Sequence, residues 1–464
     1  TASASVARQT DLPFVFATDD TAIIELTDLA MRVDLSGVAI TRPSVSTTVT
    51  NGTFDSNVTS WTDSDEAGGT SAWATGGYVS LLGDGTNYAI RDQQVTVGVA
   101  DQGDEHALAI YVYRGTATLK VGSSAGGEQY ITATTLRQGY HSIAFTPTGD
   151  FHIRLQANDT TATLVSSCTV EASGAMVIPT PWPAASLQDV RFDQSGDVLF
   201  VACTGYRQRR IERQGTRSWS VVEYIPEDGP FRNENTVPIT MTVAALTGST
   251  TLTASQPYFR STNVGSLFRC ASLGQTVNKS VTAENQYSDS IRVTGIDSGR
   301  VFSIVFTGTW TATVTLQRSV GEPGDWTDVT TYTMNQSTTY DDTLDNQIIY
   351  YRIGVKTGGY TSGTAVCQLS YAAGSIQGVG IVTGYTSTTV VDIDVLTAFG
   401  TTTATGDWWE GQWSDRRGWP SGVALFDGRL WWAGKDAENG SVSDAFDSFY
   451  DGTEGDSGPI KRSI

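Results

Sequence analysis

Apolar and polar residues alternate along most of the chain, which is the pattern of β-strands that bury one face. Clear examples are Ala22–Leu26, Leu108–Tyr113 and Val301–Phe306. Clusters of Gly, Asp, Asn and Thr bound these runs. No stretch longer than about ten residues combines helical periodicity with helix start and stop signals. The pattern therefore predicts an all-β protein.

Three separated segments share a further pattern, in which an apolar strand is followed by a tight polar turn and a second apolar strand. They are Phe14–Leu35, Val190–Arg213 and Val423–Gly434. Hairpins of this kind are typical of the blades of a β-propeller. Because far more residues separate the segments than one blade needs, we expect whole domains to be inserted between the blades.

The predicted architecture is an irregular, discontinuous β-propeller platform with two inserted β-sandwich domains. The platform comprises residues 1–47, 174–235 and 376–464. The first insertion is predicted as a jelly roll at residues 48–173, and the second as another sandwich at residues 236–375. Short, regularly spaced strands in the first insertion and Thr-rich alternating strands in the second favour sandwiches.

Charge narrows the range of partners. The 464 residues include 49 acidic and 29 basic ones, which gives a formal net charge of −20. Such a surface argues against a protein that grips nucleic acid by counterion release, although like charge would let DNA slide past without sticking. One basic stretch, Tyr206–Arg217, stands out, and strand alternation places Arg207 and Arg209 on one face and Arg210 on the other.

The sequence contains no pattern that indicates a bound cofactor or a membrane-spanning segment. Four Cys lie far apart without a Cys-x-x-Cys pair, and His106, His141 and His152 all lie within the first predicted sandwich. No apolar run approaches the roughly 18 residues that a membrane helix needs. We therefore expect no cofactor and no membrane span. The sequence begins without Met and ends without a closing element, so we expect a piece of a longer protein.

Paired carboxylates are the enzyme signal to weigh, because an acidic β-protein can be a glycosidase. The candidates near aromatic residues are Asp63, Asp65, Glu66, Asp407, Glu410 and Asp415. With 49 acidic residues such proximity arises by chance, and no nucleophile elbow, phosphate loop or zinc-protease motif is present. We predict that the protein is not an enzyme and that these acids are solvated loop residues.

The first insertion opens with Asn51-Gly-Thr-Phe and a Trp several residues later, and in this it resembles the sandwiches of carbohydrate-binding modules. Sugars stack on aromatic faces, and the candidate glycan-binding residues at one end of this module are Trp61, Trp73, Tyr78 and Tyr88. The alternative is that these rings fill the sandwich core. The resemblance also implies a structural calcium, for which Asp55 and Asp84 are weak candidate ligands.

Three stretches resemble the nozzle (tail tubular protein B) family of short-tailed bacteriophages and related prophages. They are Leu12–Val33, Leu187–Val201 and Trp413–Gly434, of which the last is the most specific. Within it, Pro420 restricts the preceding residue to extended backbone, and Asp427-Gly428 is expected to form a tight hairpin turn. The motif residues expected to serve packing and assembly are Trp413, Gly418, Trp419, Pro420, Gly428, Arg429, Trp431 and Trp432.

This resemblance implies a structural protein of the virion that is assembled in the host cytoplasm. It would form a hexameric ring that extends the tail tube below an adaptor ring, lets DNA pass through its lumen without sequence-specific binding, and docks tail fibres or spikes. The resemblance carries over no catalytic residues. The alternative is a surface or secreted protein that binds or cleaves glycans, such as those of a host surface, through its jelly-roll module.

Overall fold

The computed structural model describes residues 9–17, 20–293, 300–344, 347–435, 437–451 and 455–463, with only the backbone at 373–375 and 455. Strands make up 57% and helices 3% of the structure, and the sheets have a propeller-like arrangement. The predicted all-β, propeller-like fold class is therefore confirmed. Among the described residues, no helix has the length and apolarity needed to cross a membrane.

The chain folds into two compact units. The first comprises Thr1–Pro226, Trp413–Asp447 and Ile460–Ile464, and the second comprises Glu227–Gln412 and Ser448–Pro459. Each unit is thus built from segments that lie far apart in the sequence, as expected for a fold with long insertions.

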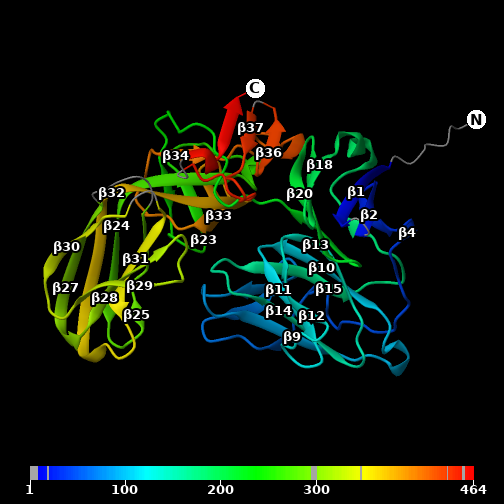
Figure 1. The fold of residues 1–464 in the computed structure, drawn as a ribbon, viewed down its shortest axis with the longest axis horizontal. Coiled ribbons are helices and arrows are strands. Elements are labelled where there is room, and N and C mark those ends of the chain that lie inside the picture. The colour runs from blue at the N-terminus through cyan, green and yellow to red at the C-terminus, as the bar shows by residue number, and fades with distance from the viewer. Residues whose placement is uncertain are drawn as a thin grey trace, which may run out of the picture. The chain divides into compact units, whose positions relative to one another are not determined.

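Three antiparallel meanders in the first unit have the form of propeller blades (Figure 1). Blade 1 contains β1 (Thr10–Ala17), β2 (Asp20–Thr27), β3 (Ala30–Leu35), β4 (Val38–Ala39) and β17 (Ile178–Pro179). Blade 2 contains β18 (Arg191–Ser195), β19 (Val198–Cys203), β20 (Tyr206–Gly215) and β21 (Ser218–Glu223). Blade 3 contains β35 (Gly422–Phe426), β36 (Arg429–Gly434), β37 (Ala437–Gly440) and β38 (Ile460–Ser463). Between blades 1 and 2, β5 (Thr41–Arg42) pairs with β16 (Gly174–Ala175), and the short helix η2 (Ala184–Asp189) precedes β18.

The first unit also contains a sandwich of two sheets. One sheet has the order β12 (Ile131–Leu136), β11 (Ala117–Gly122), β14 (Phe151–Ala157), β9 (Ala89–Val95) and β6 (Thr62–Asp63). The other continues from β21 through β13 (Gly139–Phe145), β10 (His106–Arg114), β15 (Thr163–Val170), β8 (Tyr78–Leu82) and β7 (Thr70–Ala74), and η1 (Val99–Asp101) joins β9 to β10. The core of this sandwich consists of buried apolar residues, the first of which is Phe54 and the last Cys168. All of these core residues lie inside the predicted first insertion.

A separate hydrophobic core lies between blades 1 and 2 and draws on residues from Leu12 to Ile40 and from Met176 to Val221. In blade 3, Asp427 and Gly428 have φ angles of 55° and 68° between the paired residues Phe426 and Arg429. Two consecutive positive φ angles are those of a type I′ hairpin turn, so the predicted tight turn is confirmed.

The second unit contains one sheet with the order β22 (Met241–Val243), β23 (Ser249–Ala254), β33 (Val390–Thr397), β32 (Tyr360–Tyr385), β24 (Leu267–Val281) and β34 (Trp408–Glu410). Strands β27 (Arg300–Ala312) and β30 (Ser337–Asp342) extend this sheet along β32. A second sheet comprises β25 (Gln286–Tyr287), β26 (Ile291–Val293), β31 (Ile349–Val355), β28 (Val314–Val320) and β29 (Thr327–Tyr332), and η3 (Ser261–Asn263) and η4 (Gly455–Ser457) are short helices.

The structure differs from the sequence prediction at the second insertion. The predicted boundary after residue 375 falls inside the 26-residue strand β32, which pairs with β24 on both sides of that point. One hydrophobic core of the second unit spans Val277 to Tyr371, whereas another combines residues from Met241 to Cys270 with residues from Val382 to Trp408. The long strands therefore run from one core into the next without the turn that marks a boundary in sequence.

His141 is fully buried on β13 and is held at both ring nitrogens. Nε2 lies 2.7 Å from the Arg137 carbonyl oxygen and Nδ1 lies 2.8 Å from Ser220 Oγ on β21. Because a carbonyl can only accept, Nε2 carries the proton and Nδ1 accepts from the hydroxyl. Burial lowers the pKa of His141 to about 4 and outweighs the opposing effect of the Arg137 carbonyl.

This histidine predicts a stability loss in mild acid. The pKa of His141 in the folded state lies below the unfolded value of about 6.5, so protonation favours the unfolded state. The contribution of His141 to the stability of the fold is therefore complete above about pH 6.5 and is lost as the pH falls toward the folded pKa. We expect the free energy of unfolding of the first unit to fall by up to about 3 kcal/mol over this window. Urea unfolding at a series of pH values measures how the free energy of unfolding changes with pH. His141→Gln should make the free energy of unfolding depend less on pH, and the same dependence in wild type and His141→Gln would refute the assignment.

Candidate functional site

The start of blade 2 joins all three blades through consecutive residues of β18. Phe192 packs against the core shared with blade 1. Asp193 Oδ2 accepts a hydrogen bond of 2.7 Å from the backbone N–H of Leu425 in blade 3. The side-chain amide of Gln194 accepts from the N–H of Val15 at 3.0 Å and donates to the Val15 carbonyl at 2.9 Å, which pairs it with β1 as a backbone amide would. We call this arrangement the blade junction.

An aromatic cluster supports the blade junction. Trp432 on β36 has no exposed surface, and its ring lies 4.9 Å from Tyr224 and 6.4 Å from both Phe200 and Trp413. Phe200 lies on β19, so the cluster packs blade 3 against blade 2. Trp413 and Trp432, two of the motif residues named from the sequence, thus lie in contact inside the first unit.

The remaining motif residues shape the backbone and the rim of the cluster. Gly418 has a φ of +94°, which only glycine adopts without strain, and Pro420 is buried. Trp419 is half-buried and donates from Nε1 to Asp415 Oδ1 at 2.7 Å. Arg429 is buried and donates to the Ser441 carbonyl at 2.7 Å, while Trp431 is half-buried on the opposite side of β36 from Trp432.

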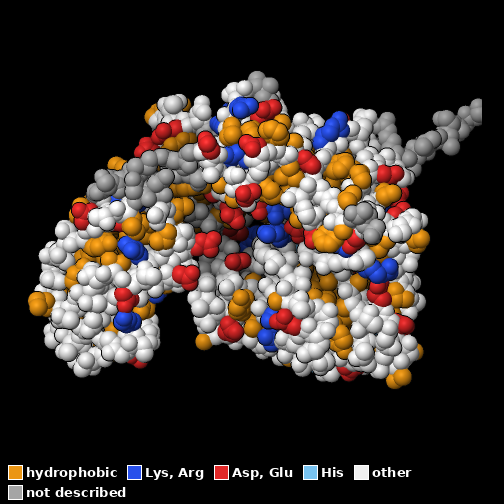
Figure 2. Space-filling view, viewed as in Figure 1, with side chains coloured by type: hydrophobic (Ala, Val, Ile, Leu, Met, Phe, Trp, Pro, Cys, Tyr) orange, Lys and Arg blue, Asp and Glu red, His pale blue; other side chains and the backbone are white. Residues whose placement is uncertain are grey.

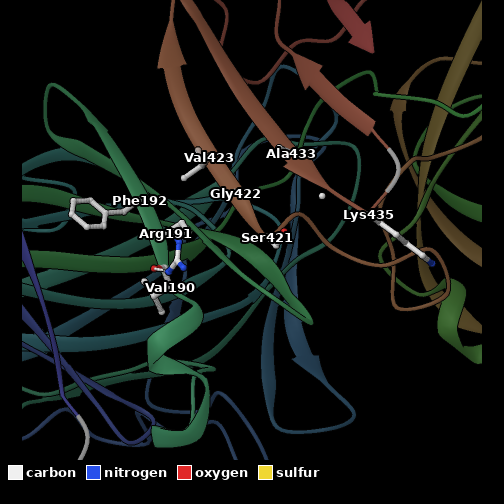
Figure 3. Close-up of a pocket in the computed structure, with 9 residues that line it drawn as sticks. Val190, Arg191, Phe192, Ser421, Gly422, Val423, Ala433 and Lys435 are labelled. Atoms are coloured by element: carbon white, nitrogen blue, oxygen red, sulfur yellow. Dashed lines mark hydrogen bonds between the residues drawn. The ribbon is translucent and has the colours of Figure 1, made fainter. Parts of the chain in front are cut away.

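A groove of about 540 Å³ lies between blades 2 and 3, next to the junction (Figure 3). Its lining residues are Val190, Arg191, Phe192, Ser421, Gly422, Val423, Ala433, Gly434 and Lys435. Figure 3 shows the start of β18 on one side and the start of β35 with the end of β36 on the other. None of these described residues is a carboxylate, His or Cys, so the lining offers no acid–base pair for catalysis.

The basic stretch of β20 is neutralised within the first unit. Arg207 and Arg209 both contact Glu223, and Arg210, on the opposite face, contacts Asp447. Farther along, Arg213 pairs with Asp20 and Asp197. Figure 2 likewise shows Lys and Arg in small groups among acidic side chains on the visible face. The stretch is therefore a set of ion pairs and does not form an open basic patch.

The four predicted glycan-binding residues do not form one surface. Trp61 is 2% exposed and lies in the sandwich core, so it offers no face to a ligand. Trp73 is 37% exposed at the sheet edge, where its Nε1 donates to the Phe54 carbonyl at 2.8 Å, and Tyr88 precedes β9 on the other sheet. Of the four, Tyr78 lies on the outer face of the sheet that contains β8.

Tyr78 belongs there to a row of tyrosines that the sequence analysis missed. Its ring stacks on Tyr113 at 4.7 Å, Tyr113 meets Tyr111 edge-to-face at 6.3 Å, and Tyr111 stacks on Tyr140 at 4.2 Å. We call these four residues the tyrosine row. The alternating strand Leu108–Tyr113 placed Tyr111 and Tyr113 on one face, which is the sequence signal that was available.

The predicted calcium ligands have other roles. Hydrogen bonds from the backbone and side chain of Asn87 and from the backbone of Thr86 hold the pKa of Asp84 below its ordinary value. Asp55 Oδ2 accepts from Thr53 Oγ1 at 2.8 Å. In the part of the chain that the structure describes, no group of three or more His, Cys, Asp or Glu residues could hold a metal ion.

The carboxylates considered for catalysis also serve as hydrogen-bond acceptors. Asp65 accepts from the backbone N–H groups of Ser71 and Ile90, and Glu66 accepts from that of Tyr88. Glu410 is buried and accepts from Tyr258 Oη at 2.7 Å and Asn263 Nδ2 at 2.8 Å. These three acids satisfy local backbone and side-chain donors, which is a sufficient reason for their positions. Glu410 departs from the prediction of a solvated loop acid, because it lies on a strand and is enclosed.

Comparisons with known proteins leave the family open. No family model matches the chain, and no curated protein matches it. Among solved structures, an IolB-like protein from Salmonella typhimurium is similar at 10% identity and a TM-score of 0.12, with 62% of this chain and 83% of that chain covered. HEPD from Streptomyces albus, with its substrate 2-hydroxyethylphosphonate and Fe(II) bound, is similar at 8% identity and a TM-score of 0.13, with 66% and 74% covered. A hazelnut vicilin is similar at 7% identity and a TM-score of 0.12, with 69% and 87% covered. TM-scores this low carry no argument about fold or function.

Proposed function

We propose that this chain is a structural subunit of the tail of a short-tailed bacteriophage, of the nozzle kind. Six copies form a ring that extends the tail tube, lets DNA pass through its lumen, and docks fibres or spikes. The protein acts in the virion after assembly in the host cytoplasm, next to an adaptor ring, and it performs no catalytic step.

The blade junction is the observation that carries this proposal. The three stretches that resemble the nozzle family lie far apart in the sequence, yet Val15, Asp193 and Leu425, one from each stretch, take part in the same set of hydrogen bonds. The most specific stretch also supplies Trp413 and Trp432 to the aromatic cluster. If a protein shares only these three stretches with the nozzle family, the part of the fold that it shares must be the part that the stretches build together. The contacts at the blade junction support this view, because they join all three stretches.

Charge supports the same proposal. The formal net charge of −20 and the internal pairing of the β20 arginines leave little that would hold a polyanion. An acidic wall repels DNA, which favours rapid passage over binding.

Electron microscopy of the purified chain, alone and mixed with the remaining tail proteins, tests the proposal. We expect ring-shaped particles with six-fold symmetry and a central channel, and mass photometry should count the subunits. A chain that stays monomeric at every concentration and never joins a tail would refute the proposal. Sugar release from host polysaccharide by the pure chain would instead favour the alternative of a glycan-cleaving protein.

A further inference from the structure

The guanidinium of Arg352 on β31 is held in place by two aromatic rings and a hydrogen bond. Its Cζ lies 3.8 Å from the ring centre of Tyr287 and 4.1 Å from that of Trp326. Its Nε donates a hydrogen bond of 3.0 Å to Gln317 Oε1. Because three neighbours restrict it, the guanidinium is oriented before any ligand arrives, which lowers the entropic cost of binding one.

The strand pairing of the second sheet in the second unit explains why these side chains meet. The residues on either side of Arg352 in β31 belong to the hydrophobic core, so Arg352 lies on the opposite, outer face of the sheet. Gln317 on β28 is its direct cross-strand partner. Tyr287 on β25 pairs with Gly354, where a Cβ would lie 2.6 Å from Tyr287 Cδ1, so this glycine makes room for the ring.

The charge of Arg352 is not compensated by an acid. In the part of the chain that the structure describes, no carboxylate forms an ion pair with this half-buried side chain, whereas the partly buried Arg154 has Asp92 as a partner. Burial lowers the pKa of Arg352 and outweighs the opposing effect of Tyr287. An anion that bound here would supply the missing opposite charge.

The surroundings of the guanidinium favour a single carboxylate over a polyanion. The planar fork formed by Nη1 and Nη2 matches the two oxygens of a carboxylate. Lys356 is already paired with Asp328, which also accepts from Gln317 Nε2 at 2.9 Å. This acid beside the site repels a chain of phosphates, and one unpaired cation releases few counterions from it. The aromatic rings, by contrast, can pack against the apolar stem of a glutamate.

We propose that the outer face of this sheet is a docking site for an acidic segment of a partner protein, in which Arg352 binds one Glu or Asp carboxylate through Nη1 and Nη2. Tyr287, Trp326 and Gln317 act as positioning residues, because they hold the guanidinium in the orientation that the carboxylate requires. The inference concerns the second unit alone and holds whether or not the chain forms a ring.

Ligand-observed NMR titration of the full chain with two peptides tests the proposal. The first peptide is acetyl-Leu-Glu-Val-Glu-Leu-amide, and the second has Gln in place of both Glu residues. We expect the Glu peptide to bind, with an affinity that falls as the ionic strength rises, and the Gln peptide to bind at least about tenfold more weakly. Arg352→Gln should weaken binding of the Glu peptide by about tenfold or more, and Arg352→Lys, which keeps the charge but loses the fork, by a few-fold.

Arg32→Gln is the matched control. Arg32 on β3 in the first unit is also half-buried and donates to a hydroxyl, Thr27 Oγ1, at 3.0 Å. Its replacement changes the net charge by the same amount as Arg352→Gln, so this variant should bind the Glu peptide as the wild type does. Thermal unfolding shows whether each variant is folded, and Arg352→Lys keeps the test valid if Arg352→Gln unfolds.

Four outcomes would overturn the proposal. The first two are the absence of binding to the Glu peptide and equal binding of the Gln peptide. The third is an equal loss of affinity in Arg352→Gln and Arg32→Gln, which would indicate an effect of net charge alone. The fourth is another occupant: tighter binding of a thymidine hexanucleotide would indicate a nucleic-acid site, and self-association that Arg352→Gln abolishes, without peptide binding, would indicate a contact between copies of this chain.

Discussion

Replacing Trp432 with alanine is expected to lower the free energy of unfolding of the first unit by about 3 to 5 kcal/mol. The side chain is fully buried among Phe200 on β19, Tyr224 directly after β21, and Trp413 in the segment between β34 and β35. Strands that are hydrogen-bonded to their neighbours cannot move in to fill the space of an indole ring, so a cavity remains. Urea unfolding followed by hydrogen exchange of the amides of β19 and β36 measures the loss in this unit.

Two variants separate packing from the mere loss of a tryptophan. Trp431→Ala removes the adjacent ring, which is half-buried on the other face of β36, and should cost about 1 kcal/mol. Trp432→Phe keeps most of the ring, and the indole N–H that it removes has no hydrogen-bond partner among the described residues. Its cost should therefore be well below that of the alanine variant. Equal losses in Trp432→Ala and Trp431→Ala would show that the cluster does not hold blades 2 and 3 together.

Local features of the fold could be predicted from the sequence. The alternation of Leu108–Tyr113 predicts a strand, and the structure has β10 over these residues. Asp427-Gly428 predicts a turn because few residues other than Asn, Asp and Gly tolerate two positive φ angles. Such signals depend on the conformational preferences of neighbouring residues, which the sequence contains directly.

The limits of the second insertion could not be predicted in the same way. Strand β24 continues through Gly274, which has a φ of +71° at an irregularity in the pairing with β32. A glycine inside an alternating run predicts a turn or a bulge with equal justification, and the partner strand about a hundred residues away decides between them. Here the partner β32 is long enough to reach both hydrophobic cores of the second unit, so the strand continues.

In the candidate sites too, the sequence predicts local features but not the contacts between distant segments. The packing role of Trp432 follows from its place on a hairpin, but the contact with Phe200 depends on how blades 2 and 3 pack. Tyr78 and Tyr113 lie on strands separated by β15, and the bulge that brings their rings together has no local sequence signal. A list of aromatic residues near one end of the module therefore included Tyr78 but not its neighbours.

Arg42→Ala is the second substitution expected to have a large effect, with a loss of about 3 to 5 kcal/mol. Arg42 is buried, and its guanidinium lies 2.7 Å from Glu171, 2.9 Å from Glu105 and 2.7 Å from Ser142 Oγ. Burial would raise the pKa of Glu105, but hydrogen bonds from Arg217 and Arg42 outweigh it and hold the pKa below its ordinary value. Removing Arg42 leaves Glu171 without this partner and Glu105 with Arg217 alone, so carboxylates withdrawn from water lose their compensation.

This loss should depend on charge, which distinguishes it from a loss of packing. Arg42→Ala combined with Glu171→Gln removes the uncompensated carboxylate and should recover part of the stability. Lys120→Ala breaks the more exposed pair with Glu128, whose nitrogen and oxygen lie 2.8 Å apart, and should cost at most about 1 kcal/mol. Urea unfolding of the three variants near neutral pH gives the comparison. A loss in Arg42→Ala as small as that in Lys120→Ala would mean that the network contributes no more than a surface ion pair, and no recovery in the double variant would mean that Arg42 acts through packing.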